Sequence, residues 1–524
     1  MTLIQSLNIA RESLVNNQYA LTVVSHNVAN INTEGYSRQR AVFEEISNAF
    51  PGNGVAAVVY GLGGAKIQGI ESYANSALNE AVRNANSETE YYNQLASMMG
   101  DIETIVDQLG DDGLLASFNE FYTACQNLSN SPTDSSTRQS YYIAAKNLCA
   151  EFNYLSTSLT DKKEAIAGNY QLTSTAQNGS LAMNVNMLNQ KLEELTKLNA
   201  QITKMSSSVT GSMNTLIDKR DALLEEISSF IPIQTKEEDY GAMTVMLNGV
   251  GLVRGNTMVN ELKVVSGGTY DEPVIIQAVS KINGEVSANN LNDAFGERGI
   301  IGAQLAMVTS RDGFMSINTL LDNLDNLANN FAATMNAIQT YANGDTKACY
   351  ITTDAQGNTV LSSETPPALF EGVGAAGIKV SDAIKADYNK IAAARVDTSL
   401  ANWEKNVGNS TNALQMAESR SNYVVDSSGN TPAGNVPVAP DVTVNDFLIS
   451  VTTDFASQLA DINSKKDVND SILTSVLDQR NGAISVNLDE ELADMIKFQR
   501  AYEASARVFS TTNEVMQTLI TLGG

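Results

Sequence analysis

Residues 3–31 read LIQSLNIARESLVNNQYALTVVSHNVANI. Along one side of this stretch, residues recur at alternating spacings of four and three, as the a and d positions of a heptad repeat do. They are Leu3, Leu7, Ala10, Leu14, Asn17, Leu21, Val24, Val28 and Ile31, and Asn17 is the polar exception. The pattern predicts an amphipathic helix. Because a helix at the end of a chain has no core around it, its apolar stripe needs a partner.

The other end of the chain carries a second stripe with the same spacing. Its members are Leu488, Leu492, Met495, Gln499, Tyr502, Ala506, Phe509, Asn513, Met516 and Ile520. We therefore expect the two ends to pair. The polar members either fix the register of the pair or face solvent at its edge. An isolated amphipathic helix is marginal in water, so we expect both ends to be poorly ordered in a lone subunit and ordered in an assembly.

Between these ends, the periodicity changes twice. Helical patterns are predicted at 72–108, 114–130, 134–167, 181–206 and 212–229, after a turn at 30–36 and an extended or hairpin stretch with Gly61, Gly63 and Gly64. A period near two predicts strands over 232–308. A long helix follows at 311–341, and 344–440 mixes short strands with helices near 382–394 and 399–420 and a Pro/Gly/Ser-rich stretch at 426–440. Helical patterns return at 443–480.

These elements predict a multi-domain α+β fold with both chain ends at one pole. We expect residues 1–36 and 486–524 to form a terminal helical coiled coil. An elongated helical rod domain would comprise 37–231, 311–343 and 441–485. A β-rich outer domain would be inserted at 232–310, and 344–440 would form a mixed outer segment.

Composition limits the classes of partner. The 524 residues carry 33 Lys plus Arg against 59 Asp plus Glu, and the net charge of −26 disfavours binding to nucleic acid or to anionic lipid. No apolar run is long enough to span a bilayer, so membrane insertion is not expected, and composition by itself favours a cytoplasmic protein. The three cysteines, Cys125, Cys149 and Cys349, are too far apart in sequence to indicate a metal site, and we interpret them as free thiols.

The sequence offers little catalytic chemistry. Its single histidine, His26, has no nearby acid to orient it as a general base, and we interpret it as structural. The glycines of 248–255 are better explained as strand turns than as a nucleotide-binding loop. The densest acidic run, Asp489 to Glu491, is interpreted as a solvated face at a helix start. We predict no catalytic residues, no cofactor and no bound metal, and therefore no enzymatic activity.

Two terminal motifs resemble those of a known family. The segment Asn27 to Gln39, with Asn30, Asn32, Thr33, Gly35, Tyr36, Arg38 and Gln39, resembles the N-terminal signature of flagellar rod, hook and hook-associated proteins. At the other end, Leu488 to Leu492 followed by Gln499, Tyr502, Ala504 and Ala506 is similar to the hook-associated protein 1 family in particular. Interior segments at 128–138, 216–224 and 248–253 also resemble that family. The likeness fades over 344–440, and Lys219 stands where the family commonly has Gln.

This resemblance implies a structural subunit at the junction between the hook and the filament of the bacterial flagellum, needed for filament assembly and motility. It implies export by the flagellar type III apparatus with a dedicated chaperone and without a cleaved signal, which replaces the cytoplasmic interpretation with an extracellular one. The implied partners are further copies of the chain in a ring or helical assembly, the hook protein and the filament-proximal junction subunit. The coiled-coil positions expected to carry assembly are Leu3, Leu7, Leu14, Leu21, Val24, Val28, Ile31, Leu488, Leu492, Met495, Tyr502, Phe509 and Met516.

Two alternatives stay open. The chain could be another axial subunit, either the hook protein or the filament-proximal junction protein. It could also be an exported adhesin-like protein or hydrolase whose activity resides in an outer domain, although a single histidine and the absence of a ligand cluster argue against a hydrolase.

Overall fold

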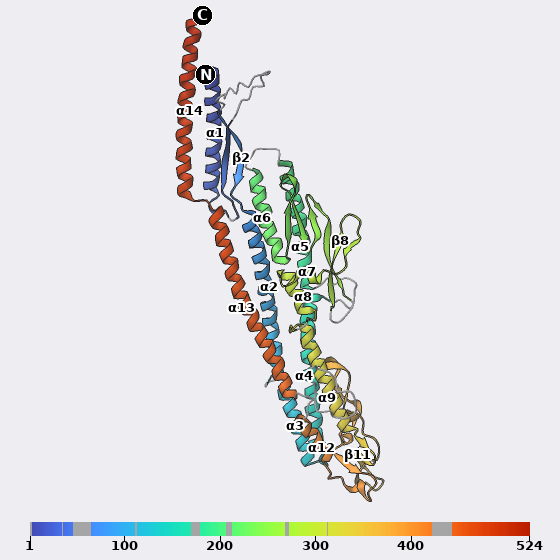
Figure 1. Ribbon diagram of the computed structural model, residues 1–524. Coiled ribbons are helices and arrows are strands. Elements are labelled where there is room, and N and C mark those ends of the chain that lie inside the picture. The colour runs from blue at the N-terminus through green and yellow to red at the C-terminus, as the bar shows by residue number, and fades with distance from the viewer. Residues whose placement is uncertain are drawn as a thin grey trace.

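The computed structural model describes residues 3–33, 35–45, 64–110, 113–168, 179–205, 212–267, 272–311, 313–421 and 443–523. Gly61, Gly63 and the 426–440 stretch considered above lie outside these ranges. The molecule is long and narrow, and both chain ends lie at the same pole (Figure 1). The predicted multi-domain α+β fold is confirmed.

Helices dominate the chain. They are α1 (Leu3–Ala29), α2 (Ser76–Val106), α3 (Leu114–Asn130), α4 (Ser135–Ala167), α5 (Ser180–Met205), α6 (Ser212–Phe230), α7 (Asn292–Phe295), α8 (Gly299–Val308), α9 (Ile317–Gln339), α10 (Gly374–Gly377), α11 (Asp382–Ala386), α12 (Thr411–Glu418), α13 (Val444–Ile484) and α14 (Leu488–Gly523). The long ones begin and end close to the predicted positions. Asp134, for example, accepts a bond from the Thr137 amide and so starts α4 directly after the break at Pro132.

The strands form several small antiparallel sheets. They are β1 (Gln39–Glu45), β2 (Ala65–Ser72), β3 (Gln234–Glu237), β4 (Met243–Leu247), β5 (Val250–Arg254), β6 (Thr257–Met258), β7 (Asn260–Ser266), β8 (Val274–Ser280), β9 (Val286–Ala288), β10 (Ala342–Asn343), β11 (Thr346–Cys349), β12 (Ile351–Thr353), β13 (Thr359–Leu361), β14 (Phe370–Glu371), β15 (Lys379–Val380) and β16 (Ala394–Asp397). In the predicted β-rich region they are arranged as the sheets β3-β4-β5-β6 and β7-β8-β9. The glycine-containing segment 248–255 supplies turns there, with Gly249 at φ 83°.

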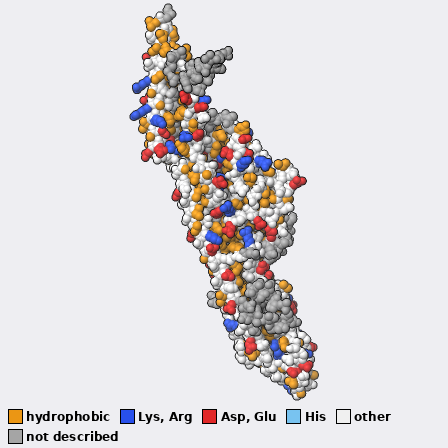
Figure 2. Space-filling view, in the orientation of Figure 1, with side chains coloured by type: hydrophobic (Ala, Val, Ile, Leu, Met, Phe, Trp, Pro, Cys, Tyr) orange, Lys and Arg blue, Asp and Glu red, His pale blue; other side chains and the backbone are white. Residues whose placement is uncertain are grey.

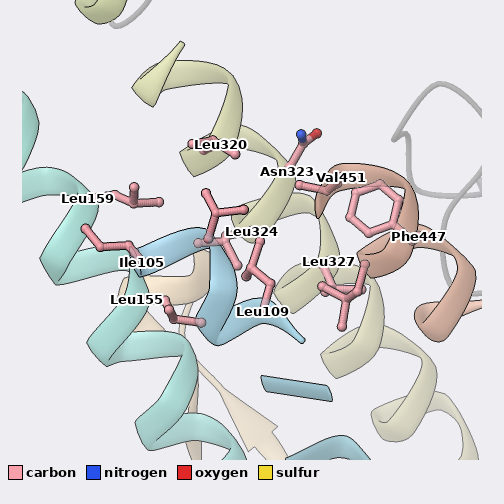
Figure 3. A pocket seen from close by; sticks show the side chains of 12 residues that line it. Ile105, Leu109, Leu155, Leu159, Leu320, Asn323, Leu324, Leu327, Phe447 and Val451 are labelled. Carbon is pink, nitrogen blue, oxygen red and sulfur yellow. The ribbon is translucent and has the colours of Figure 1, made fainter. Parts of the chain in front are cut away.

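A bundle of long helices forms the middle of the molecule. Helix α13 runs beside α2, and α9 runs back beside α4 (Figure 1). Where α13 starts, Phe447 and Val451 meet leucines of α9 and α4 (Figure 3). The cavity left among these side chains has a volume of about 10 Å³, so the returning helix is closely packed.

Part of the region predicted as strands is helical. Residues 299–308 form α8, and almost every side chain of this helix is buried. A helix buried on all sides is apolar all round, so the sequence shows no period of 3.6 there. The prediction of strands up to 308 is therefore wrong after Ala288.

Residues 342–421 pack against the ends of α4 and α9. The fully buried Arg138 donates from Nε to the Pro132 carbonyl and from Nη1 to the Ile391 carbonyl, both at 2.8 Å. Burial lowers the pKa of Arg138 to about 10, and the nearby charge of Asp387 partly opposes this shift. Asn336 of α9 donates from Nδ2 to the Phe370 carbonyl at 2.8 Å and accepts from the Phe370 amide at 2.9 Å.

The helices predicted near 382–394 and 399–420 are much shorter in the structure. Helix α11 ends at Ala386, and the chain then forms a single turn and enters strand β16. Helix α12 covers only Thr411–Glu418. Short apolar runs such as Ile391 to Ala394 do not distinguish a strand from a helix, and here pairing of β16 with β11 decides.

Candidate assembly site at the chain termini

The two ends of the chain form an antiparallel helical pair, α1 with α14, which we call the terminal coil (Figure 1). The hairpin β1–β2 covers another side of α1, where the Asn16 side-chain amide donates to the Ala65 carbonyl. The pairing of the two ends predicted from heptad spacing is therefore present within a single chain.

The predicted positions on α1 face this pair and the hairpin. Val24 is buried, and Leu3, Leu7, Leu14, Leu21 and Val28 are half-buried. Ile31, which follows the helix, is exposed. Because two neighbours cover α1, its buried arc is wider than a two-helix seam, and the predicted stripe lies within that arc.

The predicted positions on α14 divide into two groups. Met495, Phe509 and Met516 are half-buried. Leu488, Leu492 and Tyr502 are 44%, 43% and 39% exposed. The α14 side chains that meet α1 or its hairpin include Glu491, Phe498 and Ser505, which the predicted stripe leaves out. The expectation that the whole stripe pairs with α1 is therefore wrong for six of its ten members, because the observed seam is turned towards Glu491, Phe498 and Ser505.

Asn27 is the centre of the network that joins the two ends. Its Nδ2 donates to the Gln39 carbonyl at 2.8 Å and to Glu491 Oε2 at 3.0 Å. Its Oδ1 accepts from the Gln39 amide at 3.0 Å and from the Tyr36 hydroxyl at 2.8 Å. An asparagine side chain has two donors and two acceptor sites, and all four are used while Asn27 is 1% exposed.

The remaining signature residues make the turn that brings Tyr36 and Gln39 back to Asn27. Asn30 donates from Nδ2 to the His26 carbonyl at 2.8 Å and accepts from the Thr33 hydroxyl at 3.2 Å. Gly35 then has φ 76°, a conformation that favours glycine. Asn32 is exposed on the turn. The signature therefore encodes a folded turn, and Asn27 at its start is the residue around which the turn closes.

His26 is part of this turn. Its Nδ1 lies 3.0 Å from the Tyr36 hydroxyl, and because that hydroxyl donates to Asn27, the histidine ring nitrogen acts as the donor. Burial raises the pKa of Tyr36 above its ordinary value, and the carboxylates of Asp218 and Glu491 add to the effect. A tyrosine held in its neutral form suits a structural hydrogen bond.

Arg38 connects three separate segments of chain. Its Nε donates to Glu491 at 2.7 Å and its Nη1 to Glu490 at 2.6 Å. Its backbone amide donates to the Ile484 carbonyl at the end of α13, and its carbonyl accepts from the Tyr73 amide, both at 2.9 Å. Its guanidinium also lies 5.3 Å from the centre of the Tyr73 ring.

Glu491 corrects one sequence interpretation. The run Asp489 to Glu491 was expected to be a solvated face, yet Glu491 is 1% exposed and accepts from both Arg38 and Asn27. A buried carboxylate needs such partners. Its spacing gave no sign of this role. The basic residue Arg38 within the signature was the available clue, because a partly buried arginine favours a carboxylate as its partner.

A polar cleft of about 540 Å³ lies beneath the turn, between Gly35 and Ser37 on one side and α2, α6 and α13 on the other. The Ser37 amide donates to Asp218 Oδ2 at 3.4 Å. Burial raises the pKa of Asp218 to about 6; the bonds from Ser37 lower it, and nearby Asp221 raises it further. The terminal coil therefore meets the rest of the molecule through polar contacts.

The signature positions on α14 lie further along the helix. Ala506 is half-buried, whereas Gln499, Tyr502 and Ala504 are exposed. None of the helices in the described part of the chain combines the length and apolar character that a membrane span requires. Within the described ranges, His, Cys, Asp and Glu side chains form no group of three that could hold a metal ion. The cysteines at 125, 149 and 349 are free and buried.

Comparison with known families matches three parts of the chain. A model described as the helical domain of the flagellar hook-associated protein FlgK matches residues 99–346. A model of the C-terminal region of the flagellar basal body rod proteins FlgEFG matches residues 484–522, and a flagellar basal body rod protein model matches residues 7–36. The last two cover most of the terminal coil and the turn as far as Tyr36.

Curated relatives and a solved structure agree with this. Flagellar hook-associated protein 1 of Bacillus subtilis is 27% identical and covers 98% of this chain and 97% of its own. The proteins of the same name from Salmonella typhimurium and Escherichia coli are 22% and 21% identical, over 98% and 97% of this chain and 99% and 100% of theirs. The structure of the flagellar hook junction protein FlgK from Burkholderia pseudomallei shares the fold, with a TM-score of 0.58 at 13% identity. It covers 78% of this chain and 100% of that chain.

The relatives extend over nearly the whole chain, the matched models include both of its termini, and the fold agrees. The chain therefore belongs to the flagellar hook-associated protein 1 family of structural flagellar proteins.

Proposed function

We infer that this protein is a structural subunit of the bacterial flagellum that forms the junction between hook and filament and is needed for filament assembly and motility. Membership of the family supports this. The observation that carries the mechanism is the terminal coil. Its signature residues close a buried network within one chain, while α14 keeps apolar side chains at its surface.

We propose that those exposed side chains contact neighbouring subunits. Leu488, Leu492, Ile496 and Tyr502, which we call the apolar flank, are each 39% to 52% exposed. Spacings of four place Leu488, Leu492 and Ile496 on adjacent turns of one side of the helix. Figure 2 shows further apolar surface towards the free end of α14. A row of exposed apolar side chains on a long helix is typical of an interaction site.

The partners follow from the same inference. We propose that the chain assembles with further copies of itself, with the hook protein on one side and with the filament-proximal junction subunit on the other. We also propose that it reaches the outside of the cell through the flagellar type III export apparatus, with a chaperone. The main apolar cluster includes no residue of α1 or α14, which suits ends that are less stably ordered in a lone subunit than the helical bundle is. Absence of enzymatic activity remains a prediction.

The domain division remains a proposal as well. The terminal coil would form one domain, the helical bundle a second, and residues 232–310 and 344–440 the outer parts. The alternative of an adhesin-like role for the outer parts has no supporting contact in the described residues. The alternative of a hook or filament-proximal subunit is not distinguished by the terminal coil, because those subunits would share it. Cells lacking the protein distinguish these roles. If the protein sits at the junction, its loss leaves hooks without filaments and releases flagellin into the medium. Normal filaments in such cells would exclude the junction role.

A substitution tests the apolar flank directly. Leu492→Asp should leave the circular dichroism and melting temperature of the purified subunit nearly unchanged, because this side chain is exposed in the single chain. It should strongly reduce incorporation into flagella, measured as swimming and as subunit recovered from sheared flagella. Ala493→Asp is the matched control, since residue 493 is also exposed but points about 100° away. Equal incorporation of the two variants would contradict a role for the flank.

A further inference from the structure

Two polar contacts join α1 and α14 inside the terminal coil. Near the middle of α1, Ser13 Oγ lies 2.7 Å from Ser505 Oγ. Near its end, Asn27 donates to Glu491 at 3.0 Å. Both contacts are at least partly buried, in a helix pair that is otherwise held by apolar side chains.

These two contacts have the same spacing on both helices. Residues 13 and 27 are 14 apart, and so are residues 491 and 505. Fourteen residues are two heptads, so each pair of positions lies along one line of its helix. Midway between them, the same register places Ala20, which is 1% exposed, opposite Phe498. A small side chain therefore faces a large one between the two polar layers.

The hydrogen bonds of the serine layer have a defined direction. Ser505 Oγ donates to the Ala501 carbonyl at 2.8 Å, so the bond between the two serines uses the hydroxyl hydrogen of Ser13. Ser13 Oγ in turn accepts from Asn17 Nδ2 at 3.2 Å. Asn17, the polar member of the α1 stripe, thus supports the layer, whereas Gln499 and Asn513 of α14 are exposed and do not.

A shift of one heptad breaks every one of these layers. Moved in one direction, Glu491 lies opposite Ala20 and Phe498 opposite Ser13. Moved in the other, Phe498 lies opposite Asn27 and Ser505 opposite Ala20. Each arrangement removes partners from buried polar groups, and both separate the Glu491 carboxylate from Asn27. The apolar positions alone would tolerate such a shift, because leucines, valines and methionines recur every seven residues.

We propose that the Ser13–Ser505 and Asn27–Glu491 layers fix the register of the terminal coil. Register determines how far α14 extends beyond α1 and therefore where along the molecule its apolar flank is presented. The same register brings Glu491 to Arg38, so it also connects the coil to the end of α13. The inference concerns a single chain and does not depend on where that chain assembles.

Disulfide trapping in the full-length protein measures the register. Ser6→Cys with Thr512→Cys continues the observed register by one heptad, and both positions are half-buried. Ser6→Cys with Leu519→Cys reports a chain slipped by one heptad. The three native cysteines are buried and do not compete. Intramolecular cross-links are quantified by mass spectrometry. Because both yields depend equally on how often the coil closes, their ratio reports register alone.

The layers are then removed by Ser13→Ala/Ser505→Ala/Glu491→Ala. The ratio of slipped to observed cross-link should rise about tenfold or more. The matched control, Ser25→Ala/Ser510→Ala/Glu503→Ala, removes the same groups from exposed positions and should leave the ratio unchanged. Keeping Ser13 and using Ser505→Thr in place of Ser505→Ala restores both hydroxyls of the serine layer and should lower the ratio again. The proposal is overturned if the triple variant keeps the parental ratio, or if the parent fails to form the 6–512 cross-link.

Discussion

Arg38 and Arg40 are two residues apart, and the glutamates with which they pair differ in burial. Both pair with a glutamate and both lie over the Tyr73 ring. The partner of Arg40, Glu71, is exposed, and exposed pairs contribute little. The partner of Arg38, Glu491, is buried. The contribution of an arginine here depends on the burial of its partner more than on the geometry of the pair.

Replacing Arg38 should therefore be costly. Arg38→Ala leaves the buried Glu491 without its cation, and we expect a loss of about 3 kcal/mol in the stability of the terminal coil. Hydrogen exchange of the α14 amides measures this local stability. Arg40→Ala, the matched control, should change those amides little. Equal exchange in the two variants would show that Glu491 does not depend on Arg38.

Asp218 predicts a dependence on pH. Its folded pKa of about 6 lies above its ordinary value of 3.8, so the folded state binds the proton more tightly than the unfolded chain. Stability should therefore fall as pH rises from about 4 to about 6, and then stay level with respect to this group. Asp218→Asn removes the ionised form and should raise the melting temperature at pH 7.5, with the gain vanishing near pH 4.

The comparison of melting temperatures between pH 4 and 8 checks this. Asp239→Asn, at an exposed aspartate, serves as the control and should have little effect at any pH. If Asp218→Asn loses stability at pH 7.5, the ionised carboxylate stabilises the folded state, contrary to the effect expected from its burial.

At the scale of elements, hydrophobic periodicity and helix-breaking residues predicted most of the helices. Helix α4 follows Pro132 and begins at the cap Asp134, so it is predicted nearly to both ends. Helix α9 carries a clear apolar side and is predicted nearly to its end, although it begins at Ile317 and not at 311. Helix α8 was missed because it is apolar on all sides. The helix expected near 382–394 ends at Ala386, because the chain then leads into β16, whose pairing partner β11 lies about 50 positions earlier.

The seam of the terminal coil shows the limit of pattern reasoning most clearly. On α14 the apolar positions predicted a stripe, but Glu491 and Ser505 form the observed contacts. Periodicity of apolar residues points to the apolar flank as the side that faces α1, because polar residues are expected to face solvent. Their partners, Asn27 and Ser13, lie more than 460 residues away in the chain, so no local signal reveals that they are satisfied.

At the scale of the molecule, the terminal coil and the bundle have separate interiors. The main apolar cluster runs from Tyr91 to Ile462 and includes no residue of α1 or α14. We therefore predict that deleting residues 1–32 leaves the remainder folded, with an unchanged cooperative melting transition, and abolishes motility and secretion of the subunit. A loss of the melting transition would show that the bundle needs the coil, and normal filaments would show that assembly does not.

The separation of Ser13 and Ser505 by 492 positions also concerns the order of events during folding. In an unfolded chain, bringing such distant residues together has a large entropic cost, whereas a folded bundle already holds the end of α1 near the start of α14. The terminal coil is thus expected to close last, after the bundle has formed. Until that moment both of its helices remain open to other molecules, and closure of the coil marks the completion of the subunit.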